Sequence, residues 1–70
     1  MTDSDQRAIR SGVTPAELLA LRTYVQTGSL RETAEQLQLA EQIVKNQLAT
    51  ARQRLGAPNT EQALHKLGLR

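Results

Sequence analysis

The stretch SLRETAEQLQLAEQIVKNQLATARQRLG, residues 29–56, decides the fold of this chain. Ser29 and Glu32 form a capping-box pattern, which predicts a short helix from Leu30 to about Leu37. A longer helix is predicted from about Glu41 to Leu55, because a glycine follows it. Only the letters QLA lie between the two helices. So short a connection makes them cross steeply and leaves one side of the longer helix bare, which is the outline of a helix-turn-helix unit.

One further helix is predicted on each side of this pair. The letters TPAE at residues 14–17 combine a cap, a proline at the first helical position and a capping-box glutamate, and the helix should end near Thr27. Asn59 or Thr60 caps a last helix that reaches about Leu67. No segment alternates with a period of two residues, so no strand is predicted. We therefore expect an all-α, four-helix helix-turn-helix domain over residues 13–70, preceded by a flexible arm over residues 1–12.

The predicted helix over residues 41–55 has two different faces. Successive residues are separated by about 100° around a helix axis. On that basis, its apolar side chains fall in one stripe that should pack on the core: Val44, Leu48, Ala51 and Leu55. The opposite face carries three amides and one small residue: Gln42, Asn46, Ala49 and Gln53.

The amides of this outer face are groups that can donate and accept hydrogen bonds together, which suits base edges in the major groove of DNA. The small side chain of Ala49 would allow a close approach. Lys45 and Arg52 lie on one flank, with Ile43, Gln47, Thr50 and Arg54 on the other. Cations beside such a face suit phosphates. An ordinary solvated helix surface is the alternative interpretation.

Composition excludes several classes of protein. Nine lysine and arginine residues against seven acidic ones give a net charge of only +2 over 70 residues. There is no cysteine, and no run approaches the roughly 20 apolar residues of a membrane span. The first residues lack the apolar segment of a signal peptide, so we expect a cytoplasmic protein. With His65 as the only histidine and no glycine-rich phosphate loop, we expect no enzyme activity, no metal and no cofactor.

Three stretches of the chain carry a family resemblance: VTPAELLALRTYVQTG at residues 13–28, LAEQIVKNQL at residues 39–48 and RLGAPNTEQAL at residues 54–64. Together they resemble the LuxR/GerE-type helix-turn-helix domain, found at the C-terminus of many bacterial response regulators and quorum sensors. More distant likenesses are to region 4 of sigma factors and to the LysR-type helix-turn-helix. The resemblance implies that Lys45 and Asn46 meet bases, that Gln47 contacts phosphate and that the fourth helix dimerises.

The chain departs from this family at three positions of the third predicted helix. Ala40 stands where a serine cap is usual, Ile43 where threonine is common and Gln47 where histidine is common. Losing the serine cap should cost about 1 kcal/mol of helix stability.

Two functions follow from these observations. The first is a bacterial or phage transcriptional regulator that binds double-stranded DNA as a homodimer, weakly paired without DNA. The residues expected to contact bases are Gln42, Lys45, Asn46 and Ala49. Those expected to contact phosphates are Arg31, Gln47, Thr50, Arg52 and Arg54. Those expected to form the dimer interface are Leu64, His65 and Leu67. The alternative is a protein-interaction module that has lost DNA affinity and contacts the transcription machinery or another regulator through exposed Ile43.

Overall fold

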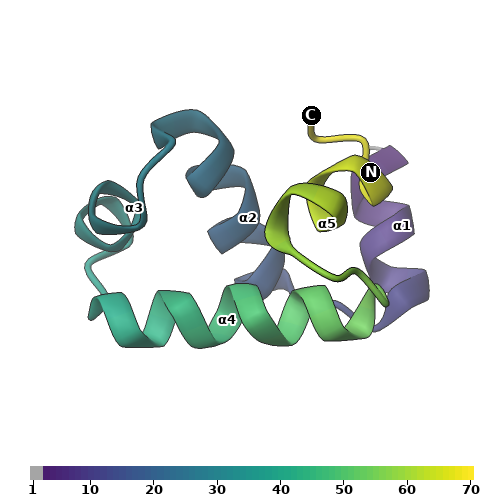
Figure 1. The fold of residues 1–70 in the computed structure, drawn as a ribbon, viewed down its shortest axis with the longest axis horizontal. Helices are drawn as coiled ribbons and strands as arrows, with labels where there is room; N and C mark the ends of the chain where they lie inside the picture. The colour runs from purple at the N-terminus through teal and green to yellow at the C-terminus, as the bar shows by residue number, and fades with distance from the viewer. Residues whose placement is uncertain (1–2) are drawn as a thin grey trace.

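The computed structural model describes residues 3–70, apart from the side chain of Ser4, and within this range it contains five α-helices and no strand. They are α1 (Asp3–Ser11), α2 (Pro15–Thr27), α3 (Leu30–Leu37), α4 (Glu41–Arg54) and α5 (Thr60–Lys66). In Figure 1, α4 lies along the lower edge of the molecule, and the other helices lie above it. The predicted all-α class is confirmed.

The helices α2 to α5 begin and end within one residue of the predicted positions. At the start of α2, the N–H of Glu17 donates to the Thr14 hydroxyl at 3.2 Å, and the N–H of Thr14 donates to the Glu17 carboxylate at 3.0 Å. Ser29 and Asn59 cap α3 and α5 with one hydrogen bond each, in which the cap side chain accepts from the N–H three residues later. The capping patterns therefore fixed where these helices start.

The flexible arm predicted over residues 1–12 is wrong for the residues that the structure describes. Residues 3–11 form α1, so the domain has five helices rather than four. Ala8 is buried, and its carbonyl accepts from the N–H of Val13 at 2.9 Å. Asp5 and Arg22 form an ion pair at 2.7 Å that joins α1 to α2. Only two residues of α1, Ala8 and Ile9, are apolar, which is too few to form a recognisable apolar stripe, and contacts with other helices hold it in place.

The core is built from small and aliphatic side chains. The helix α2 packs against both α3 and α4. The predicted inner stripe of α4 is confirmed, since all four of its apolar residues are buried. The full set of buried apolar residues is Ala8, Val13, Leu18, Ala20, Leu21, Ala34, Val44, Leu48, Ala51, Leu55, Ala63, Leu64 and Leu67.

A buried hydroxyl fixes the corner between α2 and α3. Thr33 has no exposed surface, and its hydroxyl donates to the carbonyl of Ser29 at 2.7 Å. The Thr27 hydroxyl lies 2.9 Å from that of Thr33 and also donates to Ser29 at 3.0 Å. A polar group this deep is tolerated because it is hydrogen-bonded.

The turn between α3 and α4 occupies residues 38–40. Gln38 adopts a left-handed conformation with φ 58°, and the N–H of Leu39 donates to the carbonyl of Ala34 at 3.0 Å. This closes α3 and redirects the chain at once. Ala40 is the N-cap of α4 and makes no side-chain cap bond, as its methyl group predicts. The helix α4 therefore leaves α3 sharply, with its outer face uncovered.

No helix in the described part of the chain is both long and apolar enough to cross a membrane.

Candidate nucleic-acid interface

The outer face of α4 presents the amides that the sequence analysis singled out. Gln42, Lys45 and Asn46 are exposed, and Ala49 is half-buried. The Gln42 amide nitrogen donates to the Asn46 side-chain oxygen at 2.9 Å, one helical turn away. The Gln42 oxygen and the Asn46 amino group stay available, so the pair still offers an acceptor and donors side by side. That combination matches the edge of a base in the major groove.

Lys45 and Arg52 are cations of α4 that form no ion pair with any described residue. Lys45 is exposed and Arg52 half-buried. They are seven residues apart, which places them on one flank of the helix about 10 Å from each other along its axis. An unpaired cation loses no ion pair when it meets an anion, so these two are the charges of α4 best suited to phosphates.

Arg31 lies at the start of α3 and is also exposed. It pairs with Glu35 at 3.2 Å on the same helix, and both side chains are mostly solvent-accessible. Such a surface pair contributes only about 0.3–0.5 kcal/mol. Arg31 could therefore exchange its carboxylate for a phosphate at little cost.

Arg54, a further predicted phosphate contact, is exposed but already has partners within the chain. Its guanidinium donates to the carbonyl of Gly12 and lies 3.5 Å from the Glu17 carboxylate. The Glu17 side chain is only 9 % exposed, whereas the Arg54 side chain is 40 % exposed, so only the carboxylate of this pair is sheltered from solvent. Arg54 thus ties the end of α4 to the connection between α1 and α2. The helical wheel could not show these acceptors, because Gly12 and Glu17 are far from Arg54 in the sequence.

Gln47 and Thr50, two further predicted phosphate contacts, are half-buried. The Gln47 side-chain oxygen is shielded from solvent and has no hydrogen-bond partner among the described residues. The oxygen of Gln47 thus faces the protein, and its amide nitrogen is the group that could donate a hydrogen bond to a phosphate.

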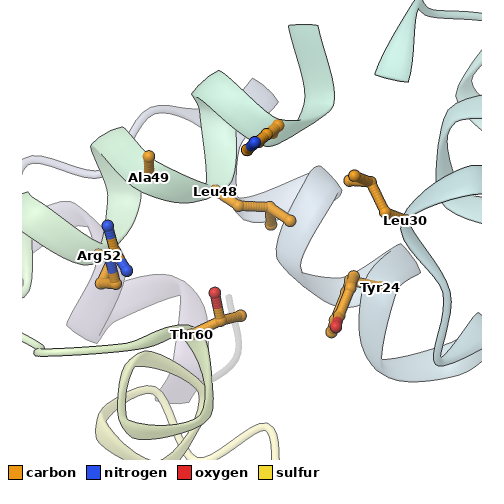
Figure 2. Close-up of a pocket in the computed structure, with 7 residues that line it drawn as sticks. Tyr24, Leu30, Leu48, Ala49, Arg52 and Thr60 are labelled. Carbon is orange, nitrogen blue, oxygen red and sulfur yellow. The ribbon is translucent and has the colours of Figure 1, made fainter. Parts of the chain in front are cut away.

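A hollow of about 260 Å³ lies beside the Lys45 and Arg52 flank of α4. Figure 2 shows side chains from several helices around it, with Leu48 and Ala49 on one wall, Leu30 and Tyr24 on another, and Thr60 below. Lys45 and Arg52 complete the lining. The positions of Tyr24, Leu30 and Thr60 around this hollow could not be predicted from the sequence, because these residues come from α2, α3 and α5 and meet only in the folded chain.

The predicted dimer contacts on the last helix need correction. Leu64 and Leu67 have no exposed surface within a single chain, because α5 uses both to pack on the core. His65 is exposed. Only His65 of the three therefore remains accessible to a second copy.

Within residues 3–70, no three histidine, aspartate or glutamate side chains come together in a way that could hold a metal ion. Comparison of the chain with protein-family models, with curated proteins and with solved structures gives no match.

Proposed function

We propose that this chain binds double-stranded DNA in a sequence-specific manner, as a transcriptional regulator, with α4 in the major groove. The observation that carries the proposal is the uncovered face of α4. Gln42, Lys45 and Asn46 are exposed in its first two turns, next to a three-residue turn that keeps α3 away from them. A major groove accommodates one helix, and amides on that helix can read base edges.

Phosphate contacts would come from both sides of this face. Lys45 and Arg52 supply unpaired charge on one flank, and Arg31 supplies an exchangeable charge at the start of α3. Thr50 would add a hydroxyl donor on the other flank. Phosphate contacts position a protein and base contacts give it specificity. In this proposal, therefore, Arg31 and Arg52 set affinity whereas Asn46 and its neighbours set sequence preference.

The test is an anisotropy titration of the chain against genomic duplex fragments at two salt concentrations. Asn46→Ala should weaken binding to the preferred sequence by roughly 1–3 kcal/mol and leave binding to other sequences almost unchanged. Gln6→Ala, which removes an exposed amide on α1, is the matched control and should bind like the wild type. An equal loss across all sequences for Asn46→Ala would rule out base reading by this residue.

A second candidate function is a protein-interaction module, favoured by two exposed apolar side chains at the start of α4. Ile43 is 46 % exposed and Leu39 is 39 % exposed. Ile43 lies on the flank of α4 away from Lys45, and Leu39 lies in the turn just before that helix. Exposed apolar patches are typical of partner contacts. Absence of any salt-sensitive duplex binding, with binding to a protein partner lost in Ile43→Ser, would favour this function over the first.

A further inference from the structure

The hollow beside α4 combines apolar side chains with unpaired positive charge. Leu48 is only 6 % exposed, and Leu30 and Tyr24 are half-buried against the same core. Lys45 and Arg52 line the hollow from α4. Ala49 also lines the hollow, and its small side chain takes up little of the space (Figure 2).

A phosphate is a poor occupant for such a place. An anion that leaves water must be compensated by hydrogen bonds or charges on all sides, and four of the lining residues offer mainly carbon. An apolar side chain gains from the same surface because its contact removes hydrocarbon from water on both partners. The hollow is also large enough, since roughly 150 Å³ already accommodates a benzene ring in a protein. Its volume of about 260 Å³ therefore fits one leucine or aromatic side chain.

The spacing of the two cations indicates what should surround this side chain. Lys45 and Arg52 are separated by seven residues, about 10 Å along α4. A second helix that lay along α4 would match that distance with two acidic residues, one three positions before its apolar anchor and one four positions after it. This is the helix-in-groove mode of recognition, with charge complementarity at both ends of the anchor.

We propose that the hollow binds an acidic amphipathic helix of a partner protein, which inserts one apolar side chain between Lys45 and Arg52. Because Lys45 also belongs to the face proposed for DNA, the peptide and DNA would exclude each other. The mutual exclusion of peptide and DNA rests on the proposed function, whereas the binding of the peptide does not.

The probe is a designed, fluorescent helical peptide with a leucine anchor and glutamates three positions before it and four after it. The chain of residues 1–70 should bind it in an anisotropy titration. Replacing the leucine by serine in the peptide should weaken binding about tenfold or more. Replacing either glutamate by lysine should weaken it by a similar factor. Equal binding of the serine peptide would mean that charge alone is recognised, and would overturn the proposal.

Variants of the protein locate the site. Thr60→Phe would fill the hollow from α5 without changing α4, and it should abolish binding of the peptide. Gln62→Phe places the same ring on an exposed position of α5 outside the hollow and should bind as the wild type does. Circular dichroism of both variants checks that they are folded. Peptide binding that survives Thr60→Phe in a folded protein would place the peptide elsewhere and overturn the proposal.

A duplex titration with the same proteins separates the two proposals. Peptide binding that depends on the anchor supports the hollow as a protein site even if no duplex binds, in which case only the DNA function fails. When both bind, unlabelled peptide should displace the duplex. If the peptide does not bind while Thr60→Phe weakens duplex binding, the hollow is part of the nucleic-acid interface instead, and the peptide proposal is wrong.

Discussion

At the scale of single residues, the turn between α3 and α4 contains one helix cap that a different side chain would improve. Ala40 has the extended backbone of an N-cap, with φ −66° and ψ 146°, but no oxygen to accept an N–H from α4. Ala40→Ser should stabilise the fold by about 1 kcal/mol. Thermal unfolding should show a melting temperature higher by about 4–8 °C. Ala40→Val is the control and should give no gain; an unchanged serine variant would mean that the first N–H groups of α4 are satisfied by water.

Gln38 in the same turn carries a conformational cost. Its φ of 58° lies in the left-handed region, which is unfavourable by about 1 kcal/mol for residues other than glycine. Gln38→Gly should therefore raise the free energy of unfolding in a urea titration, and Gln38→Val should lower it. A glycine variant less stable than the wild type would show that the glutamine side chain contributes contacts worth more than the strain.

At the scale of helices, α5 contributes core rather than interface. Leu64→Ala should destabilise the single chain by about 2–5 kcal/mol, because it leaves a cavity at a residue with no exposed surface. His65→Ala, one position along on the exposed side, should leave stability unchanged. Chemical unfolding of the two variants measures this. A folded Leu64→Ala protein of unchanged stability would restore the predicted interface role for this leucine.

What could be predicted from the sequence also differs from helix to helix. The helices α2, α3 and α5 were predictable because their caps are local, each formed by residues three positions apart. The helix α4 has no side-chain cap and was predictable from its apolar stripe and from the glycine that follows it. The outer face of α4 was predictable because a helical wheel needs only the spacing of residues. The helix α1 was not predictable from its apolar pattern, although Asp3 and Asp5 in its first turn and Arg10 in its last suit a helix dipole. The partner of Arg54 and the hollow depend on contacts between helices, which spacing along the chain does not encode.

At the scale of the whole molecule, charge is distributed so that neighbouring arginines have different roles. Arg52 forms no ion pair within the part of the chain that the structure describes, whereas Arg54, two residues later, joins α4 to Gly12 and Glu17. Arg52→Ala should flatten the salt dependence of duplex binding by about one unit and hardly affect stability. Arg54→Ala should instead lower the free energy of unfolding by about 1–2 kcal/mol, since it leaves the Glu17 carboxylate without its counter-charge. Duplex titrations at several salt concentrations and urea unfolding measure both effects. The reverse pattern would contradict the roles given to the two residues.

The wall of the hollow formed by Tyr24 has an optical consequence. The chain contains no tryptophan and no phenylalanine, so Tyr24 is its only aromatic residue and its only intrinsic fluorophore. Its ring lies half-buried among Leu30, Leu48 and Thr60, where any occupant of the hollow would change its surroundings. Ultraviolet emission of the unlabelled wild-type protein therefore reports from that one place. Quenching by acrylamide should fall when the hollow is filled and rise when the chain unfolds, so a single untagged sample can follow both events.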